Sequence, residues 1–261
     1  MDAFEQAHRD YERDGVAIIK NMFTYEEVCS IRRWATLALI YSSTDKPYRS
    51  GCRMQYTKTG SPALAFWPAL TSGYLNSIRC SRRLGAVVKS FLGEDVKQLN
   101  NQVYYRWPGD DDAFAYHQDV MFRKAMAIDF DHSDYLQTAI IVDPMTEKNG
   151  GINFVLGSHR CDDLQLCEKE SLRTETGAPV IFDNSDSEAP LPVKTMCAEP
   201  GDVMVWSVMA VHGSGKNLSH HSRMTYMNGF CRSKSCEAWP QYFDANGDAI
   251  HHPDVEDIPY A

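Results

Sequence analysis

His117 and Asp119 stand two positions apart, and His212 follows 95 residues later. Two imidazole nitrogens and one carboxylate oxygen can occupy one face of Fe(II) and leave its other positions open. Ser214 and Arg223 come next, and Arg223 opens an otherwise apolar stretch. An arginine in such a stretch needs a partner, and its planar guanidinium suits a carboxylate, although a surface salt bridge is the commoner role for a single arginine. These residues predict an open metal centre beside a carboxylate-binding group.

The His-x-Asp spacing alone identifies nothing, because the chain contains it four times. The other pairs are His8/Asp10 on a predicted helix, His132/Asp134 in an acid-rich loop, and His252/Asp254 in a Pro-containing tail. The loop pair is the serious rival as a metal pair. Three acids surround its histidine, which is typical of a hydrated loop, and such a loop can also form a substrate lid. His159 follows Gly157-Ser158 and is interpreted as a structural or rim residue.

A polar stripe on the preceding strand favours His117 and Asp119 over the other pairs. Asn100, Gln102 and Tyr104 alternate along a predicted strand over 98–107 and therefore share one of its faces. Polar side chains inside a β-structure are costly unless they bind something. An edge strand with one face in water is the alternative interpretation of this stripe.

Helical patterns come first along the chain and strands come later, which predicts an α+β fold with an antiparallel β core. Helices are expected at 3–13, from the capping box at Thr24–Glu27 to about Ile40, and from Ser81 to Gly93. The expected strands are 16–19, 98–107, 136–142, 152–155, 192–197, 202–207 and 223–232. Residues 43–75 predict long loops with short elements, and 161–190 resemble an insertion.

Composition limits the classes of function. The 261 residues carry a net charge of −9, which argues against binding to nucleic acid or to an anionic membrane. No segment approaches the roughly 18 apolar residues of a membrane span, and no secretory signal is visible. The eight cysteines form no C-x-x-C pair, so we expect reduced thiols and a cytoplasmic protein. A single domain over 1–261 is expected, with a helical part to about 95, a β core over 96–235 and a loop-like tail over 236–261.

The order of these landmarks resembles the phytanoyl-CoA dioxygenase (PhyH-like) family of Fe(II)- and 2-oxoglutarate-dependent oxygenases. The matching stretches are Tyr11–Ile19, Trp107-Pro108-Gly109, His117-Gln118-Asp119, Asn149-Gly150-Gly151, Leu156–His159 and His212–Ser219 with Arg223. The resemblance implies a double-stranded β-helix, a cupin-like jelly roll flanked by N-terminal helices. It also implies that His117, Asp119 and His212 bind Fe(II).

The resemblance assigns roles to further residues. Arg223 and Ser214 are expected to bind the 5-carboxylate of 2-oxoglutarate, and Gln102, Tyr104 and Thr138 are expected contacts of the same co-substrate by position. The segments 43–75 and 120–134 match no family pattern and are expected to determine substrate specificity. Their aromatic residues Tyr56, Phe66 and Phe122 are candidate substrate contacts.

The implied reaction consumes O2 and 2-oxoglutarate, releases succinate and CO2, and hydroxylates an unactivated C–H of a small-molecule metabolite. Related halogenases lack the carboxylate that Asp119 supplies, so hydroxylation, or desaturation or ring chemistry begun by the same hydrogen abstraction, is expected rather than halogenation. A basic cluster for coenzyme A is conceivable at Arg79, Arg82 and Arg83, but a solvated helix end explains it better. Two other classes stay open: a zinc-dependent hydrolase with the same three ligands, and a metal-free β-fold binding module. The pattern does not determine the oligomeric state.

Overall fold

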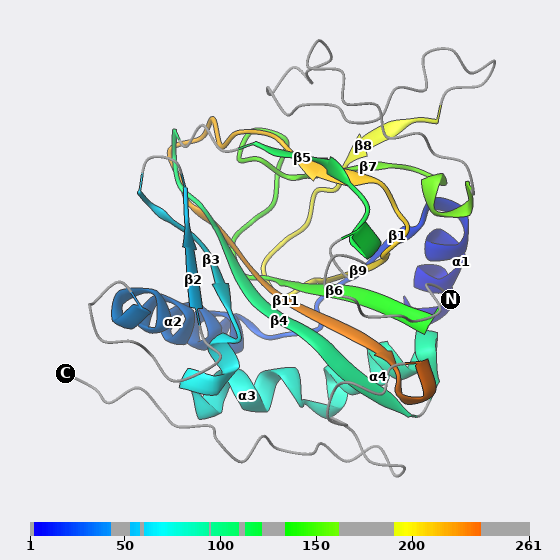
Figure 1. Ribbon diagram of the computed structural model, residues 1–261, viewed down its shortest axis with the longest axis horizontal. Coiled ribbons are helices and arrows are strands. Elements are labelled where there is room, and N and C mark those ends of the chain that lie inside the picture. The colour runs from blue at the N-terminus through cyan, green and yellow to red at the C-terminus, as the bar shows by residue number, and fades with distance from the viewer. Residues whose placement is uncertain are drawn as a thin grey trace.

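The structure is a computed structural model that describes residues 3–42, 53–57, 60–93, 95–109, 113–121, 134–161 and 191–235. Two antiparallel sheets face each other and form a jelly-roll core, as the sequence predicted (Figure 1). The larger sheet consists of β1 (Val16–Ile19), β9 (Val203–Ser207), β6 (Tyr135–Ile141), β11 (Arg223–Arg232), β4 (Val96–Arg106), β3 (Pro62–Phe66) and β2 (Arg53–Tyr56), in that order. The smaller sheet consists of β5 (Phe114–His117), β10 (His212–Ser214), β7 (Ile152–Val155) and β8 (Val193–Thr195).

Helices cover the outer face of the larger sheet (Figure 1). They are α1 (Ala3–Asp14), α2 (Tyr25–Ser42), α3 (Gly73–Arg79) and α4 (Arg82–Leu92), with short 3-10 turns at Pro68–Thr71, Ser158–Arg160 and Ser233–Ser235. The capping box before α2 is confirmed: the Thr24 backbone N–H donates to Glu27, and the Glu27 backbone N–H donates to the Thr24 hydroxyl. The Ser81 hydroxyl accepts the Leu84 backbone N–H at the start of α4. Both helix starts therefore follow from local sequence.

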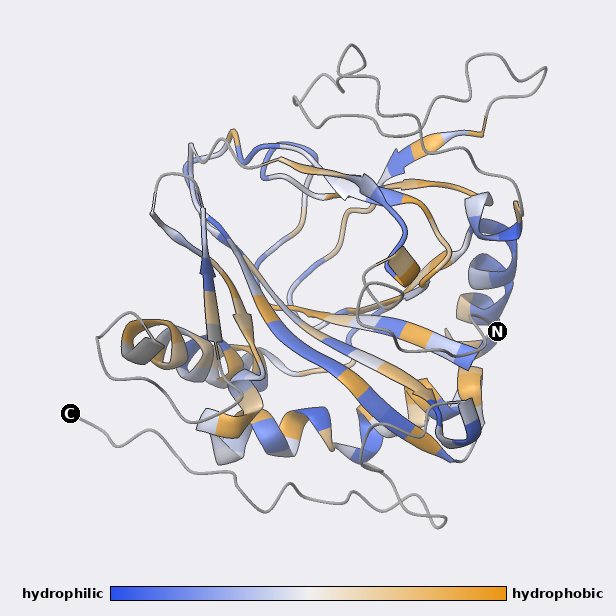
Figure 2. Cartoon of the chain, in the orientation of Figure 1, coloured by the Kyte–Doolittle hydropathy of each residue, from blue (hydrophilic) through white to orange (hydrophobic). Residues whose placement is uncertain are grey.

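The larger sheet has two differently used faces, because side chains alternate along each strand. On β9, Val203 and Val205 pack toward the helices, whereas Met204 and Trp206 point between the sheets. Hydrophilic and hydrophobic residues both occur along β4 and β11 (Figure 2). The space between the sheets is thus part apolar core and part polar cavity.

Most of the expected elements are confirmed, with strand boundaries that shift by at most two residues. The segment 43–75 was expected as long loops with short elements. Its described part contains the short strands β2 and β3, which extend the larger sheet beyond β4, and then the start of α3. Polar and apolar residues at 53–56 alternate too briefly for periodicity to identify a strand. Pairing with β3, which itself pairs with β4, stabilises β2 instead. The expected tail over 236–261 and most of the expected insertion, 162–190, lie outside the described residues.

Two further expectations can be compared with the described part of the chain. Its cysteines form no disulfide: Cys29, Cys80, Cys161, Cys197 and Cys231 are free thiols. Among the described helices, none combines the length and the apolar character needed to cross a bilayer.

Candidate active site

The three predicted metal ligands converge between the sheets. β5 and β10 are neighbours, and their register places His117 directly opposite His212, with ring centroids 4.3 Å apart. Asp119 follows β5. Its Oδ1 lies 3.6 Å from His117 Nε2, and its Oδ2 lies 3.8 Å from His212 Nε2. Among the described residues, these three form the one group of His, Cys, Asp and Glu whose ligand atoms converge, all within 4.8 Å of one another.

Backbone carbonyls orient both imidazoles. His117 Nδ1 lies 2.8 Å from the Ala115 carbonyl, and His212 Nδ1 lies 2.9 Å from the Ala210 carbonyl. Because a carbonyl oxygen only accepts, each Nδ1 carries the proton and each Nε2 presents a lone pair toward Asp119. Such an outer hydrogen bond fixes the tautomer that a metal needs.

The carboxylate is held by a third element. Trp206 on β9 donates its indole N–H to Asp119 Oδ2 at 2.9 Å, and its ring is fully buried. The larger sheet therefore orients a ligand that follows a strand of the smaller sheet. No feature of the local sequence around Asp119 points to this contact across 87 residues.

Burial and neighbouring charges set the protonation states of Asp119 and His212. Burial works to raise the pKa of the Asp119 carboxyl, but His212, His117 and the Trp206 N–H together hold that pKa below its usual range. Burial, followed by the neighbouring His117, lowers the pKa of His212 to about 4. At neutral pH, His212 is therefore neutral and Asp119 is ionised, as metal coordination requires.

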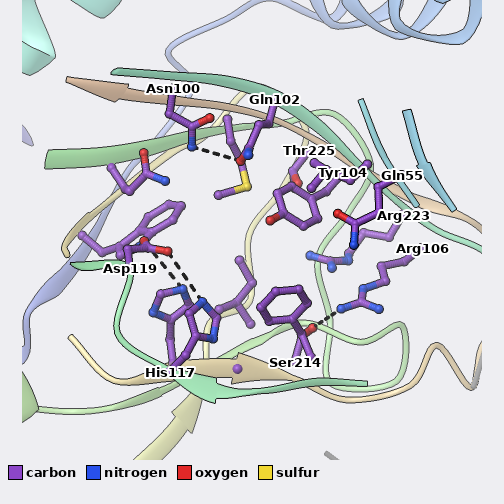
Figure 3. A pocket seen from close by; sticks show the side chains of 18 of the residues that line it. Gln55, Asn100, Gln102, Tyr104, Arg106, His117, Asp119, Ser214, Arg223 and Thr225 are labelled. Atoms are coloured by element: carbon purple, nitrogen blue, oxygen red, sulfur yellow. Dashed lines mark hydrogen bonds and ion pairs between the residues drawn. The ribbon is translucent and has the colours of Figure 1, made fainter. Parts of the chain in front are cut away.

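A cavity of about 410 Å³ opens beside the triad (Figure 3). Its cationic end is formed by Arg106, Arg223 and Ser214, and its amide side by Asn100, Gln102 and Gln137. Apolar side chains complete the wall: Leu64, Phe66, Phe114, Ile152 and Met227. The cavity volume falls in the usual range for small-molecule sites.

Arg223 stands out at the cationic end. Its side chain is 3% exposed, and its Nε and Nη1 have no hydrogen-bond partner among the described residues. Burial, and then the charge of Arg106, lower the pKa of Arg223 to about 9. A buried guanidinium with unused donors has the chemistry to pair with an anion such as a carboxylate.

The structure brings most of the other predicted contacts to this cavity. Gln102, Tyr104, Ser214 and Arg223 line it, as does Phe66. Thr138 does not: its hydroxyl donates to the Asn228 carbonyl at 2.8 Å, and it shares a strand face with residues packed against the helices. Thr138 therefore does not line the cavity as expected, and its neighbour Gln137 lines it instead.

The candidate substrate contacts need a similar correction. Tyr56 is 44% exposed and does not line the cavity, whereas the adjacent Gln55 does. A register irregularity between Gln55 and Tyr56 separates the two side chains. Phe122 lies outside the described residues.

The sequence analysis also missed contributors to the site. Arg106 continues the alternation of Gln102 and Tyr104 on β4, so the stripe that identified those two residues contained the signal for it. Gln137 and Trp206 carried no distinguishing local signal.

The rival His-x-Asp pairs do not form a comparable site among the described residues. His8 stacks on Phe91, with ring centroids 4.1 Å apart. Asp134 pairs with Arg232 at 3.0 Å and accepts a hydrogen bond from Ser235. His132 and the pair His252/Asp254 lie outside the described residues. His159 contacts the Glu12 carbonyl, in keeping with the structural role expected for it.

The comparison with known families is decisive. The sequence pattern described as phytanoyl-CoA dioxygenase (PhyH) matches residues 11–225. The chain belongs to this family of Fe(II)- and 2-oxoglutarate-dependent dioxygenases. The resemblance noted from the sequence landmarks is confirmed, and with it the expected cofactors: iron, 2-oxoglutarate and O2.

Relatives of this PhyH-family protein differ in what they act on. A probable α-ketoglutarate-dependent hypophosphite dioxygenase from Stutzerimonas stutzeri is 24% identical over 250 residues, covering 91% of this chain and 80% of that protein. The solved structure of EctD from S. alaskensis with 2-oxoglutarate and 5-hydroxyectoine has a TM-score of 0.68 at 18% identity, covering 98% and 87% of the two chains. The epimerase SnoN, solved with Fe3+, α-ketoglutarate and nogalamycin RO, has a TM-score of 0.66 at 18% identity, covering 99% and 93%. The structural likenesses establish the fold alone.

Proposed function

We propose that His117, Asp119 and His212 hold Fe(II) in this protein and that Arg223, with Ser214, binds the far carboxylate of 2-oxoglutarate. The observation that carries the proposal is one cavity containing both a convergent His/Asp/His group and a buried arginine with unused donors. Three protein ligands leave positions for a 2-oxo acid and for O2. Bound iron supplies O2 activation coupled to decarboxylation of 2-oxoglutarate, which gives succinate, CO2 and an oxidised substrate.

The protein's own residues orient and shield this chemistry. The Ala115 and Ala210 carbonyls and the Trp206 indole keep the three ligand atoms aimed at one point. Phe114 lies with its ring centroid 4.8 Å from that of His117 and forms part of the apolar wall. This wall limits the access of water, which favours oxidation of the bound substrate over side reactions.

We infer hydroxylation of an unactivated C–H as the outcome. Asp119 supplies the carboxylate that related halogenases lack, so chloride has no vacant ligand position at this centre. Relatives that include an epimerase are a reason to test the product directly. Product analysis by mass spectrometry should give a mass gain of one oxygen atom, whereas a loss of two hydrogens or an unchanged mass would contradict hydroxylation.

A zinc hydrolase is the less favoured function. It would need a general base beside the metal-bound water. Among the described residues that line the cavity, the only carboxylate and the only imidazoles are the three metal-ligand candidates. Activity that requires Fe(II) and O2 supports the oxygenase, and activity with Zn(II) in the absence of O2 would support the hydrolase.

The binding test uses Fe(II) and 2-oxoglutarate added to the protein without O2. Chelation of the 2-oxo acid to the iron is expected to produce a weak visible charge-transfer band. A wild-type protein that gives no band would contradict the proposal. Metabolites can then be screened for those that stimulate succinate release in the presence of O2.

The cavity favours a small substrate without coenzyme A. Its volume of about 410 Å³ must hold both the co-substrate and the reacting part of the substrate. Two of the three arginines considered for coenzyme A are otherwise engaged: Arg79 is buried and bonded to Gln98, and Arg83 pairs with Glu27. The uncharged amides of Asn100, Gln102 and Gln137 suit a polar small molecule.

Among these amides, Gln137 has the best-supported role in substrate binding. It is 2% exposed, and its Oε1 has no hydrogen-bond partner among the described residues. An unsatisfied buried acceptor costs roughly 1–3 kcal/mol of folding free energy. We infer that this cost is retained because the carbonyl receives a donor from the substrate.

Gln137→Met is therefore expected to raise the free energy of unfolding of the ligand-free protein by about 1 kcal/mol, because it removes the unsatisfied oxygen at similar volume. Urea unfolding measures the change. Gln98→Met is the matched control: Gln98 is buried and bonded to Arg79, Asn100 and Asn228, so its loss should destabilise. Destabilisation by both variants to a similar extent would contradict the inference.

A further inference from the structure

Arg106 forms a second cationic group beside Arg223. The two residues are direct cross-strand partners, Arg106 at the end of β4 and Arg223 at the start of β11. Both side chains are buried and line the cavity. Figure 3 places both guanidinium groups on the same side of the cavity, away from Asn100 and Asp119. These two cationic side chains therefore lie together at one end of the cavity.

A hydrogen bond joins Arg106 to the serine of the same end. Arg106 Nη2 donates to Ser214 Oγ at 2.6 Å. Because the serine oxygen accepts this bond, its own O–H remains as a donor. The bond aligns Arg106 with the hydroxyl, and Arg223 faces the same space with Nε and Nη1 unused among the described residues.

Like charges directly opposite each other on neighbouring strands are unfavourable, and the cost is greater away from water. An anion between the two guanidinium groups attracts both of them, and this attraction offsets their mutual repulsion. A carboxylate offers about four lone-pair positions, enough for donors from two guanidinium groups and one hydroxyl. The arrangement therefore fits a single carboxylate better than it fits an empty or apolar space.

We propose that Arg106 and Arg223 jointly bind the far carboxylate of the co-substrate, with the Ser214 hydroxyl between them. This inference rests on the proposed function. It assigns to Arg106 a specificity-determining role: the selection of a 2-oxo dicarboxylic acid over 2-oxo acids that end in a methyl group. The amide side of the cavity is then left to the substrate.

The test compares 2-oxoglutarate with 2-oxopentanoate, which has the same chain length without the far carboxylate. Dissociation constants are measured with Fe(II) in the absence of O2, from the charge-transfer band. Arg106→Gln is expected to weaken 2-oxoglutarate binding roughly 10- to 100-fold, the effect of one charge-assisted hydrogen bond. Binding of 2-oxopentanoate should change by less than about 3-fold, since it never engages the arginine.

Arg106→Lys keeps the charge without the fork and should lose about 3- to 10-fold in 2-oxoglutarate affinity, which provides a second variant if the glutamine variant does not fold. An equal loss for both 2-oxo acids would overturn the proposal, because it would indicate a structural role. Unchanged 2-oxoglutarate affinity in both variants would also overturn it and would leave Arg106 to an anionic group of the substrate. A wild-type protein without any band would instead contradict the proposed function itself, so the two failures are distinguishable.

Discussion

His212→Ala is expected to lower the affinity for Fe(II) by more than about 100-fold and to abolish the 2-oxoglutarate charge-transfer band. Loss of an outer hydrogen-bond partner of a metal ligand costs about 10- to 100-fold, so loss of a ligand should exceed it. His212 Nε2 is 3.8 Å from Asp119 Oδ2, and no other His among the described residues converges on that carboxylate except His117. Anaerobic Fe(II) titration with 2-oxoglutarate measures both effects.

His159→Ala is the matched control, because His159 lies outside the cavity and contacts the Glu12 carbonyl. It should keep the band and the Fe(II) affinity of the wild type. His212 also stacks on Phe154, so thermal unfolding must establish that the alanine variant remains folded. A folded His212→Ala protein that retains the band, together with a His132→Ala protein that loses it, would move the metal centre to the rival pair.

Arg223→Gln is expected to weaken 2-oxoglutarate binding by about 30- to 4,000-fold while leaving Fe(II) affinity within about 3-fold of the wild type. Truncating one partner of a buried, hydrogen-bonded charge pair costs roughly 2–5 kcal/mol. Arg223 would form such a pair with the far carboxylate of 2-oxoglutarate, because it is 3% exposed and its Nε and Nη1 are unused among the described residues. Titration of the band with 2-oxoglutarate at saturating Fe(II), and of Fe(II) alone by calorimetry, separates the two quantities.

Arg232→Gln is a control on the same strand. Arg232 is at the opposite end of β11 and pairs with Asp134 at 3.0 Å, with 39% of its side chain exposed. Replacement of Arg232 should leave 2-oxoglutarate affinity unchanged, since the side chain does not line the cavity. It should also change stability little, because a partly exposed ion pair contributes little to folding free energy. If Arg223→Gln lost Fe(II) and 2-oxoglutarate affinity equally, its role as a carboxylate ligand would be contradicted.

The helices and the long strands were predictable because their signals are local. A capping box and a periodic apolar face defined α2, and Val28, Ile31, Ala35 and Leu39 are all buried as that face requires. The short strands β2 and β3 were not predictable in this way. Their stability comes from the pairing of β3 with β4 and of β2 with β3, which is a property of the assembled sheet.

The errors at the site are errors of strand face. Thr138 and Tyr56 were expected in the site, but Gln137 and Gln55 line the cavity instead. Side chains along a strand point alternately to its two faces. A prediction that identifies the strand but mistakes which face borders the cavity therefore exchanges every side chain between the cavity and the outside. On β4 the polar stripe itself revealed the parity, whereas β6 is buried along its whole length and gave no such signal.

Residue types and their spacing were enough to identify the chemistry available to this protein: two histidines, one aspartate, a serine and an arginine, in the order and spacing of the PhyH family. Which of these groups meet became visible in the folded chain. The pairing of β5 with β10 places His117 against His212, and the pairing of β4 with β11 places Arg106 against Arg223. Such contacts depend on strand register between segments about 100 residues apart, and register is fixed by the packing of the whole sandwich rather than by either segment alone.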